Sequence, residues 1–286
     1  MIRRAVVDSN MLQAPALRTW LASEPGNVAV LPDYLWLEIY KQQTVAGLEA
    51  AFLVIRDFPD RLAVLKPSGE LANLDPSHPN LVEKMLRLCV ADEVRMTIEA
   101  ISLARRGEPE VMVQLQEKWS SAAAHMAGIL EGAADIIASL PEIAEIFTAD
   151  EIRLCRTNCR YTMGMFEKIF GAADQLYETF LQSCDVSPGH LSIEHRYDAY
   201  LYRMALGIVI YALWWIRSGS QLPKRLDRAR NDFIDLGFAV YGSYFTGLIT
   251  DDAKARWMHD NLSAALRMIG ARHGPRVART SLDATC

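Results

Sequence analysis

The sequence predicts an α/β fold with a parallel sheet, interrupted by an all-α helical insertion. Short apolar runs alternate with helical periodicity in residues 1–74, and this alternation returns in residues 223–286. Strands that are separated by helices pair in parallel through right-handed crossovers. Residues 75–222 contain no convincing strand and have long stretches of helical periodicity instead. We therefore expect one α/β domain in two segments, with the insertion between them.

Three strands are predicted in the first segment. The run "RRAVVD" predicts a strand that ends at Asp8, and "APALRTWLAS" predicts a helix that stops at Pro25 and Gly26. The runs "NVAVL" and "RLAVL" predict the second and third strands. The longer stretch between these two runs has apolar residues at helical spacing, so a helical crossover is expected there.

The insertion is expected to consist of long amphipathic helices. Breaks are predicted at residues 107–109, at Pro141 and at "DVSPGH", residues 185–190, because glycine and proline interrupt helices. The most apolar stretch, "MALGIVIYALWWI" at residues 204–216, is shorter than the ~20 residues that a membrane-spanning helix needs. We expect this stretch to form a buried helix.

The last segment predicts a helix, a strand and a final helix. The helix runs through "NDFIDLGFAVYGSYF", the strand is "TGLIT", and the final helix extends from residue 252 to about residue 270. Two adjacent acids, Asp251 and Asp252, follow the strand. Aspartate is a favoured N-cap residue and its charge suits a helix N-terminus, so one of the two is expected to cap the final helix.

The composition is that of a globular protein without an overall basic surface. The 286 residues are 51% hydrophobic and carry a formal net charge of -5, so a nucleic-acid contact would need a local basic patch. The five cysteines form no paired framework, and the N-terminal residues lack the apolar segment of a signal peptide. We expect a cytoplasmic protein that is not associated with a membrane.

Acidic residues follow the predicted strands or lie in the helices beside them. They are Asp8, Glu38, Asp232, Asp235, Asp251 and Asp252, of which Asp232 and Asp235 are expected to open their helix. Ligands of a doubly wound sheet lie outside the carboxyl ends of its strands, so these acids would converge on one rim. Clustered carboxylates raise one another's pKa, and Mg²⁺ or Mn²⁺ relieves the repulsion. The predicted chemistry is metal-assisted hydrolysis of a phosphodiester.

Four segments of the chain resemble, in order, the four motifs of the PIN domain. They are "AVVDSNML", "VLPDYLWLEIY", "RNDFIDLGFAVYGSYF" and "GLITDD". PIN domains are metal-dependent nucleases, most of which act on RNA, and they occur in toxins and in RNA-processing factors. The resemblance therefore implies a three-layer α/β/α sandwich and a ribonuclease that uses Mg²⁺ or Mn²⁺.

The resemblance also implies roles for individual residues. Metal binding and catalysis fall to four acids: Asp8, Glu38, Asp232 and Asp252. Supporting hydrogen bonds fall to Ser9, Asn10 and Thr250. Asp235 and Asp251 are further candidate metal ligands. Asp232 and Asp235 lie one turn apart on the same helix face, so either can take the helix-start role.

Several other residues have a structural and a functional interpretation. The basic residues before Asp232 predict either a solvated helix face or a phosphate-binding group: Lys224, Arg225, Arg228 and Arg230. The pairs Cys155 and Cys159, and His190 and His195, lack zinc-finger spacing, so packing or surface placement is favoured. Trp214 and Trp215 could stack on bases, but their apolar helix favours core packing, and Trp36 is also expected in the core.

Three functional hypotheses follow. The first is a PIN-like ribonuclease. The second is a catalytically inactive scaffold or regulatory module whose helical region binds a protein partner or a second copy of the chain. The third keeps the chemistry but changes the substrate to structured DNA. A PIN domain is usually compact, so the large insertion is expected to select substrate, bind a partner or cover the site.

Overall fold

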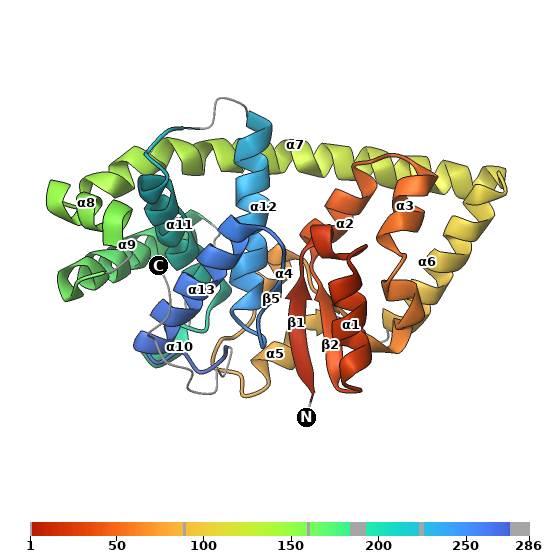
Figure 1. Cartoon of the computed structure of the whole chain (residues 1–286), viewed down its shortest axis with the longest axis horizontal. Coiled ribbons are helices and arrows are strands. Elements are labelled where there is room, and N and C mark those ends of the chain that lie inside the picture. Colours follow the sequence, from red (N-terminus) through yellow and green to blue (C-terminus); the bar gives the residue numbers. More distant parts are fainter. Residues whose placement is uncertain (1, 88–89, 159–160, 184–192, 223–225, 275–286) are drawn as a thin grey trace.

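The protein has a mixed α/β fold built on one five-stranded sheet. The computed structural model describes residues 2–87, 90–158, 161–183, 193–222 and 226–274. The strand order is β4-β3-β2-β1-β5, so segments from the two ends of the chain lie side by side in the sheet (Figure 1). The predicted α/β class is confirmed at this level.

The strands are short and mostly parallel. Their bounds are Arg3–Val7 (β1), Asn27–Leu31 (β2), Leu62–Leu65 (β3), Leu86–Arg87 (β4) and Leu248–Ile249 (β5). Strand β1 pairs in parallel with both β2 and β5, and Val6 lies opposite Val30 on one side and Leu248 on the other. Parallel strands are buried on both faces, which explains why β2, β3 and the last three residues of β1 are nearly continuous apolar runs.

Strand β4 contradicts the expectation that residues 75–222 contain no strand. It pairs antiparallel with β3, and Leu86 lies opposite Leu65. The helix before β4 ends at Lys84 because the free edge of β3 offers backbone hydrogen bonds to the residues that follow. One of these bonds runs from the Lys66 amide to the Met85 carbonyl. Two paired residues are too few to leave a strand pattern in the sequence.

Short helices surround the sheet in the first segment. They are α1 (Pro15–Ser23), α2 (Asp33–Tyr40), α3 (Val45–Ala51), α4 (Ser68–Ala72) and α5 (Leu81–Lys84), with 3₁₀ turns η1 (Ser9–Met11), η2 (Ile55–Asp57) and η3 (Pro59–Arg61). The single helical stretch expected between β2 and β3 is thus divided. Thr44 caps α3 by accepting a hydrogen bond from the Gly47 amide, which starts a new helix at that point.

The insertion is dominated by long helices. They are α6 (Val90–Arg105), α7 (Pro109–Glu145), α8 (Ala149–Asn158), α9 (Met163–Ser183), α10 (Ile193–Arg196) and α11 (Tyr200–Arg217). Figure 1 shows α7 extending across the molecule, and it contacts α2 and α6 as well as α11 and α12 (Leu226–Gly242). A break occurs at Gly107, as predicted, where φ is +83°. The expected break at residues 185–190 lies outside the described residues.

The expected break at Pro141 is wrong. Helix α7 continues through this proline to Glu145. Proline removes one backbone hydrogen bond and usually kinks a helix. Here Leu140 and Ile143 on either side are buried in the core, and this packing holds the last turn in place. Tertiary packing therefore overrides the local signal.

Two surface features bear on the class of protein. Within the described residues, α7 is the one helix that is long and apolar enough to cross a membrane, judged by length and composition, and 24% of its most apolar window is buried. One such helix is weak evidence for a membrane span.

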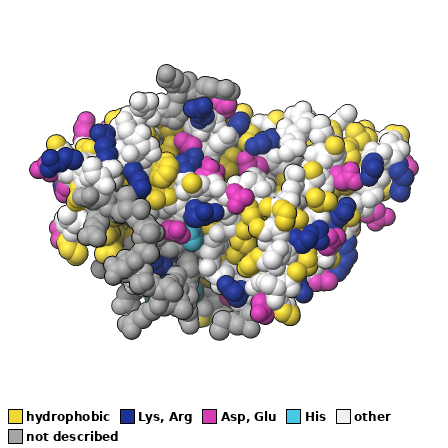
Figure 2. All heavy atoms as spheres, viewed as in Figure 1, with side chains coloured by type: hydrophobic (Ala, Val, Ile, Leu, Met, Phe, Trp, Pro, Cys, Tyr) yellow, Lys and Arg dark blue, Asp and Glu magenta, His cyan; other side chains and the backbone are white. Residues whose placement is uncertain are grey.

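Figure 2 shows acidic and basic side chains interspersed over the described part of one face, in keeping with the expected lack of an overall basic surface.

Helix α11 is buried, as predicted for residues 204–216, and a buried ion pair ties it to the end of α12. Arg203 and Asp198 are fully enclosed, and Nη2 of Arg203 donates to Oδ1 of Asp198 at 2.9 Å. The same guanidinium donates to the Ser243 carbonyl at 2.7 Å and lies 3.8 Å from the centre of the Tyr244 ring. A buried charge is tolerated only when it is paired and hydrogen-bonded, and both conditions are met here.

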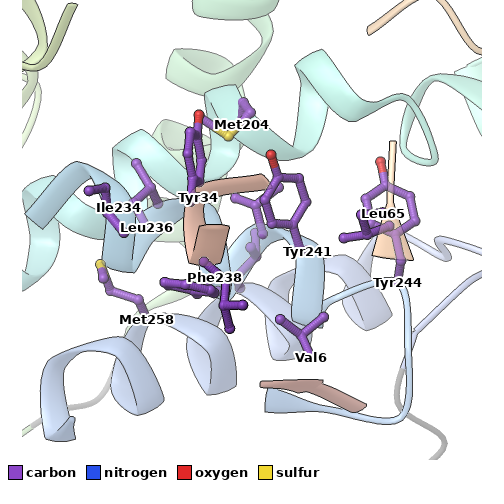
Figure 3. Close-up of a cluster of buried hydrophobic side chains, with 14 of the residues drawn as sticks. Val6, Tyr34, Leu65, Met204, Ile234, Leu236, Phe238, Tyr241, Tyr244 and Met258 are labelled. Atoms are coloured by element: carbon purple, nitrogen blue, oxygen red, sulfur yellow. The ribbon is translucent and has the colours of Figure 1, made fainter. Parts of the chain in front are cut away.

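Helix α12 (Leu226–Gly242) packs between α2, α11 and the last helix, α13 (Ala253–Met268). Figure 3 shows Tyr34, Phe238 and Tyr241 within the shared core. A Cβ added at Gly237 would lie 2.4 Å from the Tyr34 ring, and one added at Gly207 would lie 2.9 Å from Leu236. These two glycines let α12 approach α2 and α11 more closely than any other residue would allow.

We expect Gly237→Ala to destabilise the fold. The added methyl group would overlap the buried Tyr34 ring, and such overpacking lowers the free energy of unfolding by about 1–3 kcal/mol. Gly171→Ala on the exposed face of α9 is the matched control, because no atom lies within 4 Å of its added Cβ. That variant should gain about 0.5–1 kcal/mol. Urea unfolding of both variants tests this, and equal effects would contradict the close approach.

Candidate active site

A cleft opens where the carboxyl ends of β1 and β5 meet α2 and α12. Its volume is about 790 Å³. The lining residues are Asp8, Ser9, Asn10, Glu38, Trp214, Gln221, Leu222, Arg228, Asn231, Asp232, Asp235, Asp252 and Lys254. Five of these are carboxylates, and they come from segments up to 244 residues apart in the chain. Five of the six acids expected to converge on this rim of the sheet therefore line one cleft, and Asp251 does not.

Asp8 lies directly after β1 and is buried. Its Oδ2 accepts a hydrogen bond from the Thr250 hydroxyl at 2.6 Å. The Ser9 hydroxyl lies 3.5 Å from the other oxygen of Asp8 and hydrogen-bonds to Glu38. Burial raises the pKa of Asp8; the hydrogen bond from Thr250 opposes this shift, and the charge of Glu38 adds to it. The predicted supporting roles of Ser9 and Thr250 match these contacts.

Asp252 both caps α13 and lines the cleft. Its Oδ1 accepts a hydrogen bond from the Ala255 amide at 2.8 Å, and its own amide donates to the Thr250 hydroxyl at 2.9 Å. Asp251 is exposed and lies outside the cleft lining. The two adjacent acids therefore diverge, since the helix start turns Asp252 inward and leaves Asp251 in solvent.

Asp232 and Asp235 face the cleft but do not open their helix. Helix α12 begins at Leu226, so the expectation of a helix start at these acids is wrong. The helix extends upstream because Ala229, one turn before Phe233, packs into the interior at 2% exposure. Both acids line the cleft together, and the Tyr211 hydroxyl donates to Oδ2 of Asp232 at 2.8 Å.

Two lysines pair with the acids, and neither was predicted from the sequence. Nζ of Lys254 forms ion pairs with Asp232 and, at 2.8 Å, with Asp235. Nζ of Lys41 lies 2.8 Å from Glu38, three residues earlier in the same chain segment. The position of Lys254 two residues after Asp252 is the one signal in the sequence that could have drawn attention to it.

The electrostatics of the cleft follow from burial and from these pairs. Burial raises the pKa of Asp235 to about 7, and the charges of Asp252 and Asp8 add to this, while Lys254 opposes it. Burial alone would lower the pKa of Lys254, but the charges of Asp235 and Asp232 outweigh it, so the pKa is raised. The ammonium group is therefore charged at neutral pH.

The remaining candidates divide between the cleft and other places. Asn10 and Arg228 line the cleft, whereas Arg230 is half-buried outside its lining. Lys224 and Arg225 lie outside the described residues. Trp215 is buried and Trp36 packs on Phe52, as expected of core residues. Trp214 differs from that expectation, because it is half-buried on the cleft wall with its ring 5.3 Å from that of Trp257.

Of the cysteine pair and the histidine pair, the structure describes one residue each, Cys155 and His195. Cys155 is buried, which agrees with a packing role. Its expected neighbour Cys159 lies outside the described residues, as does His190. His195 belongs to the short helix α10.

The carboxylates suit a hard divalent cation by their chemistry. Mg²⁺ and Mn²⁺ prefer carboxylate and water oxygens, and five carboxylates surround the cleft. As the side chains stand, however, no three His, Cys, Asp or Glu residues within the described part of the chain are close enough to enclose an ion. The ammonium of Lys254 between Asp232 and Asp235 is one physical reason for this spacing.

Comparisons with protein-family models, with curated proteins and with solved structures gave no match. The resemblance to the PIN domain therefore depends on the residues of this chain alone.

The raised pKa of Asp235 predicts a pH-dependent stability. An unfolded aspartate titrates near pH 3.9, so between about pH 4 and 7 the folded state binds the extra proton. The stabilisation is complete below the unfolded pKa and is lost as the pH rises through the folded pKa. From pH 4.5 to 7.5 in EDTA, the wild type should lose about 3 kcal/mol relative to Asp235→Asn.

Urea unfolding at the two pH values measures this difference. Asp251→Asn is the control, because its carboxylate is exposed, and its curve should stay parallel to that of the wild type. A constant difference between the wild type and Asp235→Asn would mean that Asp235 is not buried among acids. The groups that face Asp235 are Lys254, Asp252, Asp8 and Asp232.

Proposed function

We propose that the protein is a PIN-like nuclease that hydrolyses phosphodiester bonds of RNA with Mg²⁺ or Mn²⁺. The observation that carries this proposal is the convergence of five carboxylates from four separate segments on one cleft at the end of β1. Part of the same proposal is a three-layer α/β/α sandwich formed by residues 1–74 and 223–286, to which residues 75–222 add the edge strand β4 and the helical insertion.

In this proposal four acids hold the metal: Asp8, Glu38, Asp232 and Asp252. When bound, the ion would lower the pKa of a water molecule and stabilise the charge on the leaving oxygen. The chain itself supplies orientation. Thr250 donates to Asp8 and receives the amide hydrogen bond of Asp252, so one hydroxyl fixes two candidate ligands. The Ser9 hydroxyl lies between Asp8 and Glu38 and donates to Glu38.

The cleft wall offers contacts for a nucleic acid. Arg228 presents a guanidinium, which suits phosphate, and Gln221 and Asn231 present amides. The half-buried ring of Trp214 provides an apolar face on which a base can stack. With a net charge of -5 the chain has no overall basic surface, so in this proposal binding depends on local contacts such as these.

Lys254 is the specific observation that favours a second candidate function. An ammonium that permanently occupies the position between Asp232 and Asp235 would leave a vestigial site in a scaffold whose helical region binds a protein partner. Divalent metal separates the two candidates, because a ligand of the folded state raises the melting temperature by mass action. A rise with Mn²⁺ supports the nuclease, and no rise supports the scaffold.

We expect Asp8→Asn to abolish cleavage without unfolding the protein. Loss of a metal ligand should lower the cleavage rate at least about 100-fold, because even indirect support of a metal ligand is worth 10–100-fold. The matched control is Asp251→Asn, which removes the same charge from an exposed position outside the cleft. The assay follows cleavage of labelled RNA in Mn²⁺, with circular dichroism to check the fold.

The same assay on labelled DNA distinguishes the substrates. Cleavage of RNA alone agrees with the proposal, and cleavage of flapped DNA alone favours the structure-specific DNA nuclease. Equal activity of the wild type and Asp8→Asn would refute the site itself.

We expect Arg228→Gln to weaken RNA binding uniformly across sequences. One lost phosphate contact reduces the slope of log affinity against log salt by about 1. Arg267→Gln is the control, because Arg267 is exposed near the C-terminal end of α13, outside the cleft lining. Fluorescence anisotropy in EDTA at several salt concentrations measures both slopes. An unchanged slope for Arg228→Gln would remove this residue from the substrate path.

A further inference from the structure

Lys254 occupies the centre of the acidic side of the cleft. It lies in the first turn of α13, and its side chain crosses to α12, where Nζ contacts Asp232 and lies 2.8 Å from Asp235. The side chain is only 18% exposed. Lys41, the other lysine on a cleft acid, is 41% exposed and reaches Glu38 from the surface. The two ammonium groups are therefore in different environments.

We propose that Lys254 is an internal counter-ion that holds Asp232 and Asp235 together in the metal-free protein, and that Mg²⁺ or Mn²⁺ displaces it on binding. Lys254 then sets the affinity of the site for metal. This inference depends on the proposed function, because it takes Asp232 to be a metal ligand.

The arrangement of the two acids explains how one cation can hold both. Asp232 and Asp235 are three residues apart on α12, so their carboxylates project from the same face of the helix. A single ammonium between them offsets one of their two negative charges when both are ionised. A divalent ion bound to the same oxygen of Asp232 would face the ammonium at short range, and like charges so close repel strongly. The two cations therefore exclude each other.

The surroundings of Lys254 allow it to leave without loss of the ligand geometry. The other oxygen of Asp232 accepts a hydrogen bond from the Tyr211 hydroxyl at 2.8 Å, which keeps this carboxylate oriented when Lys254 departs. Asp252 stays in place through its hydrogen bond from the Ala255 amide. The side chain of Lys254 is flexible, and the cleft beside it has a volume of about 790 Å³. An ammonium released from Asp232 thus remains in the cleft, where Asp235 and a substrate phosphate are its anionic partners.

The test compares Mn²⁺ binding by the full chain with that of Lys254→Met, which removes the charge and keeps most of the apolar stem. Isothermal titration after EDTA treatment should show at least about tenfold tighter binding by the variant. In EDTA the variant should melt at a lower temperature than the wild type, because two buried acids lose their counter-ion. Its melting temperature should rise further than that of the wild type when Mn²⁺ is added.

Lys168→Met is the matched control. It removes the same charge and breaks an ion pair with Glu151 at 2.6 Å, but it lies on α9 outside the cleft lining. Its Mn²⁺ affinity should equal that of the wild type. If Lys254→Met does not fold in EDTA, Lys254→Gln repeats the titration, because its amide can still donate to Asp232.

The outcomes separate this inference from the proposed function. Equal or weaker Mn²⁺ binding by Lys254→Met overturns the counter-ion role. Absence of Mn²⁺ binding by both proteins overturns it as well, together with the metal site. Tighter binding by the variant, with no RNA or DNA cleavage by either protein, supports the role of Lys254 and refutes the nuclease.

Discussion

The close packing of α12 is the constraint on which the rest of the structure depends. Gly237 lets this helix lie against the Tyr34 ring of α2, and Gly207 lets α11 lie against its other side. The buried pair of Arg203 and Asp198 then anchors α11 to the carbonyl of Ser243 just beyond α12. The same helix therefore joins the insertion to the sheet and carries two acids to the end of β1. A shift of α12 would change the fold and the cleft together.

The acids of the cleft are held in place by opposing physical effects. Burial raises the pKa of Asp8 and of Asp235, while Thr250 and Lys254 stabilise their charged forms. A cluster of this kind is stable only if cations or hydrogen-bond donors balance it. The chain supplies these partners itself through Lys254 and Thr250. When a metal ion replaces the ammonium of Lys254, the acids therefore exchange one cation for another and keep a counter-charge throughout.

The sequence predicts those parts of the fold that have a local pattern. The β-branched runs locate β1, β2, β3 and β5, and their order predicts which acids meet, because parallel strands end at one rim. Contacts between distant segments leave no such pattern. The two-residue strand β4, the uninterrupted helix at Pro141 and the early start of α12 depend on neighbours in space. The pairing of Lys254 with α12 and the place of Trp214 on the cleft wall were missed for the same reason.

The most direct measurement of the central claim is the position of bound Mn²⁺. Crystals of the protein soaked in MnCl₂ allow the ion to be located by its anomalous scattering. The account predicts a peak within bonding distance of Asp8 and Asp232, with the ammonium of Lys254 moved away from α12. A cleft without a Mn²⁺ peak, with Lys254 still paired to Asp232 and Asp235, would contradict it.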